Sequence, residues 1–203
     1  MAVAPLTLIA IAARAATLTG FAELPADTFM PGPTSGQFIE ASNNRLPPFT
    51  DKQPVQGFSA LLEGENGAYY VLSDNGFGTR ENSPDYLLSI YQVYPDFRTV
   101  NGGDGKIRVG RVIHLRDPGV YLPYPATRED RLLTGADLDP ESFCRVADGS
   151  FWIGEEFNPS LLHFSADGVM LAAPFKLNGL NAENNPTGEP ASLPRSRGFE
   201  GMA

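Results

Sequence analysis

The chain has 203 residues, and 24 acidic against 15 basic side chains give it a formal net charge of −9, which argues against the basic surface needed to bind a nucleic-acid backbone. Glycine (21 residues) and proline (18 residues) are abundant and disfavour helix interiors, so a helical bundle is not expected. The single cysteine, Cys144, can form neither an internal disulfide nor a thiolate metal site by itself.

The chain opens with an apolar segment, residues 2–13, followed by Arg14. This segment is far shorter than the roughly 20 residues of a membrane-spanning helix, so no stable membrane span is expected. Its length and the small residues at its end fit a signal peptide, although no basic region precedes it. We therefore expect residues 1–16 to be a leader and the protein to be secreted or periplasmic. The alternatives are an element of the folded domain, or a start site placed downstream of the true one.

From residue 17 onward, short strands alternate with clusters of turn residues. Long loops are predicted at 24–58, 116–140 and 176–197. Asn-Gly at 66–67 and Asp-Gly at 148–149 are typical of tight hairpins, because these residues accept positive φ angles. The predicted strands are 17–22, 58–62, 68–73, 86–94, 106–115, 142–146, 150–154, 160–164 and 169–175.

The two central groups of four strands resemble each other. Residues 58–75 align with 140–156, each with a hairpin turn, an aromatic second strand and an acidic end, and residues 199–202 resemble the first strand of a third copy. Repeated four-stranded units of this kind are typical of propeller blades, although two unrelated meanders can also look alike.

The predicted fold is therefore all-β, a β-propeller of about six blades when complete. Residues 17–203 are expected to form about two to three of these blades. Because a propeller closes only with about four to eight blades, we expect a C-terminal half of the propeller to be missing from this chain.

Eight segments carry a further signal: LPADTF (24–29), PGPTSG (31–36), PVQGFS (54–59), SDNGFG (73–78), LLTGADLDPES (132–142), WIGEEF (152–157), PSLLH (159–163) and SRGFEGMA (196–203). Together they resemble the phytase-like propeller family, which is described by the esterase-like activity of phytase. The resemblance runs from about residue 17 to the end of the chain. It implies a propeller fold and the hydrolysis of ester or phosphoester bonds, in proteins that are often exported.

Acidic residues recur where first strands begin and second strands end, which are positions that can converge near the axis of a propeller. Ca²⁺ binds several carboxylate and amide oxygens, and it would offset the repulsion of gathered carboxylates and attract an anionic substrate. The structural alternative is that these acids cap turns or pair with arginines. The predicted calcium ligands are Asp74, Asn75, Glu141, Glu155 and Glu200.

Two carboxylates can also act as a general acid and base, and we predict Glu155 and Glu141 for these roles. Neighbouring residues on a strand point to opposite faces, so only one of Glu155 and Glu156 can face a given site. Glu155 is preferred because it aligns with Asp74. His163, which lies within the family motif, is the third catalytic candidate, with a packed structural imidazole as the alternative.

Arg80 and Arg197 lie beside conspicuous loops and are predicted to bind a phosphate or carboxylate of the substrate, unless they form surface salt bridges. The sequence contains no Gly-x-Ser-x-Gly elbow, phosphate loop or dinucleotide fingerprint. Its two histidines do not support a zinc hydrolase. No nucleotide, haem or zinc cofactor is therefore expected.

These observations predict a hydrolase that acts on an ester or phosphoester of a small polar or anionic molecule with help from a divalent cation. Two alternatives remain open. One is a propeller that hydrolyses sugar lactones, and the other is a non-catalytic extracellular propeller that binds a small ligand.

Overall fold

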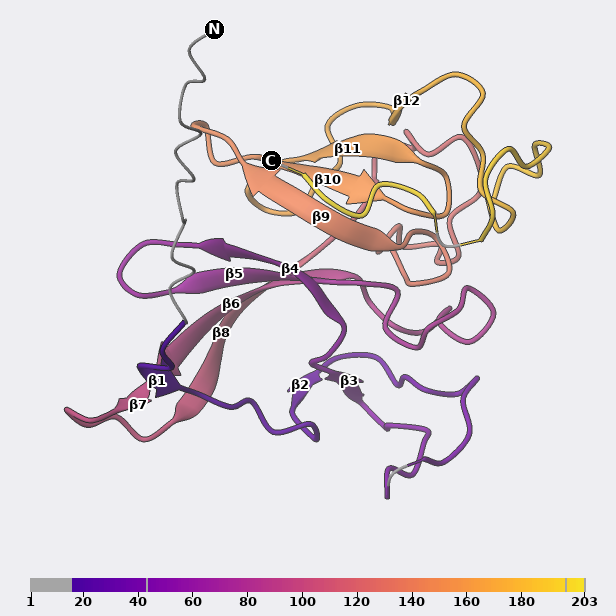
Figure 1. The fold of residues 1–203 in the computed structure, drawn as a ribbon. Helices are drawn as coiled ribbons and strands as arrows, with labels where there is room; N and C mark the ends of the chain where they lie inside the picture. Colours follow the sequence, from indigo (N-terminus) through magenta and orange to yellow (C-terminus); the bar gives the residue numbers. More distant parts are fainter. Residues whose placement is uncertain (1–15, 43, 196, 203) are drawn as a thin grey trace, which may run out of the picture.

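The computed structural model describes residues 16–42, 44–195 and 197–202. Within these residues the regular structure is entirely β, as predicted, and none of them forms an apolar helix that would reach across a membrane. Except for residue 16, the predicted leader lies outside the described residues. Two four-stranded antiparallel sheets dominate the fold (Figure 1). They consist of β4 (Phe58–Glu63), β5 (Tyr69–Ser73), β6 (Ser89–Asp96) and β8 (Lys106–His114), and of β9 (Pro140–Arg145), β10 (Phe151–Glu155), β11 (Ser160–Phe164) and β12 (Phe175–Lys176).

Each sheet is a meander in which the strands follow one another in chain order, which is the connectivity of a propeller blade. The only interruption is the short β7 (Arg98–Thr99), which pairs with β1 (Gly20–Phe21) beside the first sheet. The tight turn between β4 and β5 contains Asn66 and Gly67, both with positive φ, as the hairpin prediction requires. The all-β fold of a partial propeller is thus confirmed.

Several local predictions are wrong. The segment 24–58 is not only a loop, because β2 (Phe29–Pro31) pairs within it with β3 (Lys52–Pro54). The predicted strand 169–175 is reduced to isolated bridges at its start, because Pro174 offers no N–H to a ladder and the chain pairs again only at β12. Residues 199–202 contain no assigned strand, although the N–H of Phe199 donates to the carbonyl of Glu155 (3.4 Å).

The main hydrophobic core lies between the two sheets. Leu72 and Ile90 project from the first sheet, and Phe143, Ile153 and Leu162 project from the second, all of them buried. Complete burial of one such side chain stabilises the folded state by about 1.5–3 kcal/mol. This packing fixes the position of one sheet relative to the other, and β4 lies against β9 at their contact.

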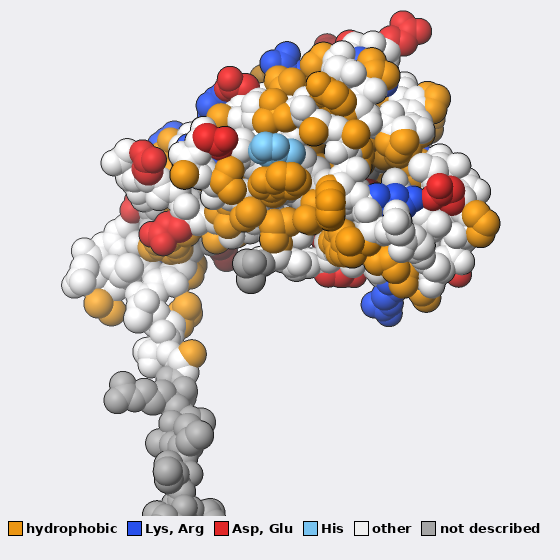
Figure 2. All heavy atoms as spheres, turned by 90° about the horizontal axis from the view of Figure 1, so that it is seen from above, with side chains coloured by type: hydrophobic (Ala, Val, Ile, Leu, Met, Phe, Trp, Pro, Cys, Tyr) orange, Lys and Arg blue, Asp and Glu red, His pale blue; other side chains and the backbone are white. Residues whose placement is uncertain are grey.

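The face of the second sheet that points away from this core is only partly covered. There the indole of Trp152 stacks on the imidazole of His163, with ring centroids 4.4 Å apart and planes inclined by 3°. Cys144 is the cross-strand neighbour of Trp152 on its other side. Figure 2 views the molecule from above Figure 1 and shows hydrophobic side chains gathered around a histidine.

Both sheets carry a bulge at the same place. The pairing of β4 with β5 skips Ser59, and the pairing of β9 with β10 skips Glu141. A bulge bends its strand and redirects the side chain of the extra residue. The two sheets are therefore related by a shared irregularity as well as by shared topology, which supports the predicted internal repeat and makes Ser59 the counterpart of Glu141.

Candidate functional site

The second strands of the two sheets are each followed directly by an acidic residue, Asp74 after β5 and Glu156 after β10. The N–H of Asp74 donates to the carbonyl of Gly57 (2.6 Å), and the N–H of Glu156 donates to the carbonyl of Asp139 (3.0 Å). Gly57 and Asp139 each stand one residue before the first strand of their sheet. Glu156 is thus the counterpart of Asp74. The predicted alignment of Glu155 with Asp74 is wrong by one residue, because strand hydrogen bonds, rather than spacing along the chain, fix the register.

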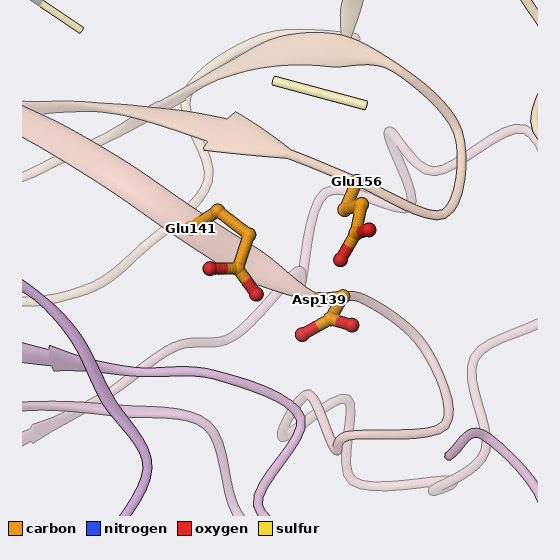
Figure 3. A group of neighbouring side chains, drawn as sticks. All are labelled: Asp139, Glu141 and Glu156. Atoms are coloured by element: carbon orange, nitrogen blue, oxygen red, sulfur yellow. The ribbon is translucent and has the colours of Figure 1, made fainter. Parts of the chain in front are cut away.

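Three carboxylates from the start of β9 and the end of β10 converge between the sheets. Asp139, Glu141 and Glu156 each place one oxygen so that all three oxygens lie within 4.8 Å of one another. Figure 3 shows the three side chains pointing toward a common space. We call these three residues the acidic group. An arrangement of this kind suits a hard divalent cation, which prefers oxygen ligands.

Asp139 is a buried carboxylate that bonds to the loop after β5 of the first sheet. Its Oδ1 accepts a hydrogen bond from the backbone N–H of Asn75 (3.0 Å), and its Oδ2 accepts one from the side-chain amide of Asn75 (2.8 Å). Burial and the nearby charge of Glu141 outweigh these donors and raise the pKa of Asp139 to about 7. The side chain is therefore about half protonated at pH 7 in the absence of a cation.

Glu141 is surrounded by further acids. Burial raises its pKa to about 7, with smaller contributions from the charges of Glu156, Asp74 and Glu200, whereas a hydrogen bond with the Ser59 hydroxyl lowers it. The pKa of Asp74 is also raised by burial, against the opposing effect of the Gly76 N–H, which donates to its Oδ1 (2.7 Å). Acids from both sheets and from the C-terminal segment thus share one electrostatic environment.

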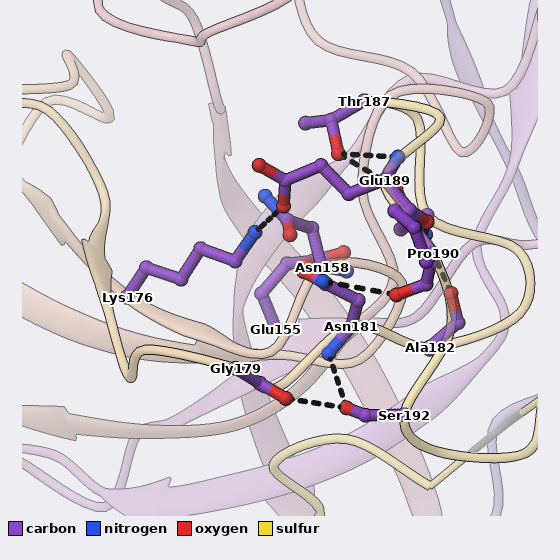
Figure 4. Close-up of polar contacts among 11 residues, drawn as sticks. Glu155, Asn158, Lys176, Gly179, Asn181, Ala182, Thr187, Glu189, Pro190 and Ser192 are labelled. Atoms are coloured by element: carbon purple, nitrogen blue, oxygen red, sulfur yellow. Dashed lines mark hydrogen bonds and ion pairs between the residues drawn. The ribbon is translucent and has the colours of Figure 1, made fainter.

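Glu155 has a different position. It is completely buried and its carboxylate accepts N–H bonds from Asp139 (3.2 Å), Phe157 (2.9 Å) and Asn158 (2.6 Å). Burial outweighs these donors and raises its pKa to about 8. Figure 4 shows Glu155 and Asn158 near the ion pair between Lys176, the last residue of β12, and Glu189 in the segment after it. In this position Glu155 fixes the turn after β10 and accepts a hydrogen bond from the backbone N–H of Asp139.

The remaining predicted ligands lie near the acidic group but differ in their contacts. The amide oxygen of Asn75 accepts a hydrogen bond from Gly78 N (2.7 Å), so this side chain bridges Asp139 to the loop after β5. Glu200 is exposed and follows Phe199, and its charge acts on Glu141.

The structure does not bring His163 to the acidic group. Its imidazole lies on the opposite face of the second sheet, stacked on Trp152 with Nε2 2.9 Å from the Ser150 hydroxyl. Arg80 donates to the carbonyls of Ala136 (3.0 Å) and Asn184 (3.2 Å), and therefore joins two loops. Arg197 is exposed and makes no hydrogen bond or ion pair with other described residues.

Two members of the acidic group, Asp139 and Glu156, are absent from the predicted ligands. Glu156 matches Asp74 only when the two repeats are aligned by their bulges, which are defined by strand pairing in the folded chain. Asp139 aligns with Gly57, so the repeat gives no signal for it.

The comparisons with known proteins agree with the resemblance seen in the sequence. The model of the Phytase-like family, described as "Esterase-like activity of phytase", matches residues 53–203. No curated protein and no solved structure matches the chain. The family match covers both sheets and the whole acidic group. With most of its length matched, the chain belongs to the Phytase-like family.

Proposed function

We propose that the protein hydrolyses ester or phosphoester bonds at the acidic group, with Ca²⁺ held by Asp139, Glu141 and Glu156. The observation that carries this proposal is the convergence of three carboxylate oxygens within 4.8 Å of one another in a chain of the Phytase-like family. A divalent cation at such a site supplies charge stabilisation for the reacting ester and acidifies a bound water.

The donor set fits a calcium ion. All three side chains offer oxygen, and neither histidine nor cysteine joins them within the described residues. Without a cation, the pKa values of about 7 for Asp139 and Glu141 mean that these acids retain protons near neutral pH. A positive ion would replace those protons, because it offsets both the mutual repulsion of the carboxylates and the cost of their burial.

Glu141 is the residue that we propose as the general base. With the cation in place Glu141 would be ionised, and its second carboxylate oxygen, which the cation does not need, would accept the proton of the attacking water. The Ser59 hydroxyl, at the matching bulge of the first sheet, orients the carboxylate of Glu141 through its hydrogen bond. Glu155 has a positioning role, because its carboxylate fixes the turn that carries Glu156.

The test is hydrolysis of p-nitrophenyl phosphate, p-nitrophenyl acetate and a sugar lactone, each in excess Ca²⁺ and in EDTA. We expect turnover of at least one of the two p-nitrophenyl esters, which Ca²⁺ increases and Glu141→Gln lowers by about a hundredfold. The matched control is Glu65→Gln, at an exposed turn residue, which should retain full activity. Turnover of the lactone alone would replace the ester assignment with a lactonase.

Calcium binding is measured separately, as the rise in melting temperature that the ion produces. We expect this rise in wild type and in Glu65→Gln, and its loss in Glu141→Gln. Equal stabilisation of all three proteins would disprove the assignment of the cation to the acidic group.

A further inference from the structure

A cavity that the proposal above does not use adjoins the loop after β5, whose Asn75 contacts Asp139 of the acidic group. It has a volume of about 620 Å³ and opens between the N-terminal segment and the loop after β5. Arg45, Gln56 and Asn82 contribute its polar lining, and Phe49 and Phe77 contribute apolar walls. The cavity is thus large enough for a small molecule and has both a charged side and a hydrophobic side.

Arg45 is held in place from two directions. Its backbone N–H and carbonyl form reciprocal hydrogen bonds with Ser42 across a tight turn (2.8 and 3.3 Å). One terminal nitrogen of its guanidinium donates to Gln56 Oε1 (2.8 Å). The other N–H groups of this side chain have no hydrogen-bond partner among the described residues. A guanidinium fixed on one side with donors left over on the other can receive the two oxygens of an oxyanion.

Asn82 supplies a second donor in the cavity. Its amide oxygen is already occupied, because it accepts hydrogen bonds from Thr79 N (3.0 Å) and the Ser83 hydroxyl (3.0 Å). These two bonds fix the orientation of the amide, and its NH₂ group has no acceptor among the residues that the structure describes. The exposed Glu40 is the only carboxylate among the described residues that line the cavity, and Arg45 is the only basic one.

A single residue connects this cavity to the acidic environment. Gly76 lines the cavity, and its carbonyl accepts a hydrogen bond from the Gln56 amide (2.6 Å). Its N–H donates to Asp74 Oδ1 (2.7 Å). Gln56, which anchors Arg45, is therefore bonded to the same glycine as Asp74. The charge of Asp74 in turn acts on Asp139 and Glu141.

We propose that this cavity binds the oxyanion group, phosphate or carboxylate, of a small molecule, with Arg45 as its principal contact. This inference rests on the proposed function: the cavity would be the subsite that selects anionic esters for hydrolysis at the acidic group. A fixed guanidinium is needed for that purpose, because a chain with a net charge of −9 otherwise repels an anion. Phe49 and Phe77 then contact the carbon skeleton of the ligand.

The experiment is calorimetric titration of the full chain in EDTA with inorganic phosphate and, separately, with succinate. We expect saturable binding of one or both anions, weakened about tenfold or more by Arg45→Ala because the charge-assisted bonds are lost. Arg111→Ala removes an equal charge from an exposed ion pair and should bind like wild type. Arg45→Lys, which keeps the charge without the planar fork, should fall between wild type and Arg45→Ala.

Because this titration requires no turnover, it separates the cavity from the proposed activity. Two results would overturn the inference even if the protein is a hydrolase. One is that wild type binds neither anion. The other is that wild type, Arg45→Lys and Arg45→Ala all bind the anions equally well. If Arg45→Ala does not fold, the comparison of Arg45→Lys with Arg111→Ala decides the same question. In an active enzyme, Arg45→Lys should raise KM for an anionic ester and leave KM for a neutral ester unchanged.

Discussion

Asn75 donates to both carboxylate oxygens of Asp139, from its backbone N–H at 3.0 Å and from its side-chain amide at 2.8 Å. Asn75 belongs to the loop after β5 of the first sheet, whereas Asp139 stands directly before β9 of the second. The position of one carboxylate of the acidic group is therefore set by a residue of the other sheet. All three carboxylates of the group come from the second sheet, but the packing of the two sheets fixes the position of Asp139.

Replacing Asn75 with Ala should remove the side-chain bond to Asp139 and the acceptor of the Gly78 N–H, and leave the backbone bond to Asp139 intact. We expect the free energy of unfolding to fall by about 1–3 kcal/mol, since a buried carboxylate oxygen loses its donor. Urea denaturation measures this change, and Asn101→Ala at an exposed turn is the matched control, with a loss below about 0.5 kcal/mol. Equal stability of the two variants would mean that the bond contributes nothing.

Stability without calcium should depend on pH through the acids with raised pKa values. Asp139 and Glu141 have pKa values of about 7 in the folded protein against 3.8 and 4.5 ordinarily, and Glu155 has one of about 8. Between about pH 4 and pH 8 the unfolded chain therefore binds fewer protons than the folded protein, and the free energy of unfolding falls as pH rises.

The expected loss between pH 5 and pH 8 in EDTA is several kcal/mol, measured by urea denaturation, because each of the three acids alone would contribute about 3 kcal/mol. Excess Ca²⁺ should reduce this loss at pH 8, because the ion takes the place of the protons. A metal-free protein that becomes more stable between pH 5 and pH 8 would show that these acids are ionised in the folded state.

Gly57→Ala tests the close approach between the chain before β4 and Asp74. A Cβ at Gly57 would lie 2.0 Å from Asp74 Oδ1, and the residue has a φ of +66°. Gly67, with a φ of +74° and no atom within 4 Å of an added Cβ, is the matched control. Strain alone should cost Gly67→Ala about 1 kcal/mol, and the clash should cost Gly57→Ala about 2 kcal/mol more, as measured from thermal unfolding.

The buried ion pair of Asp117 with Arg131 should matter far more than an exposed one. The carboxylate of Asp117 is fully buried and also accepts N–H bonds from Tyr121 (2.9 Å) and Leu122 (3.0 Å). Asp117→Asn leaves a partly buried guanidinium without its counter-charge, so we expect a loss of about 3–5 kcal/mol. Asp167→Asn breaks the exposed pair with Arg111 and should cost less than about 1 kcal/mol. Similar losses for both variants would contradict this prediction.

The all-β fold and its repeat could be predicted from the sequence because both are local signals. Turns such as Asn66-Gly67 and alternating aromatic strands need only their neighbours. The bulges at Ser59 and Glu141 could not be predicted in the same way, because a bulge is defined by a partner strand. A bulge shifts the side chains that follow it by one position, and so the choice between Glu155 and Glu156 could not be settled by strand alternation.

The acidic group was only partly predictable. Glu141 could be found because it begins a strand in the repeat, whereas Asp139 joins the group through its contact with Asn75 in a distant loop. Arg45 carried no signal, because it lies in a segment that reads as an irregular loop. Its position depends on the Gln56 side chain, which only the folded chain brings beside it.

Trp152 is the only tryptophan of the chain, and it lies on the outer face of β10 against His163. The protein therefore has a natural fluorophore at a known place. Its emission should follow the loosening of the second sheet during denaturation, independently of the tyrosines of the first sheet. Anions can be titrated into the cavity at Arg45, and Ca²⁺ into the acidic group. If the calorimetric or enzymatic signal changes while the tryptophan emission stays constant, the response does not reach the outer face of the second sheet.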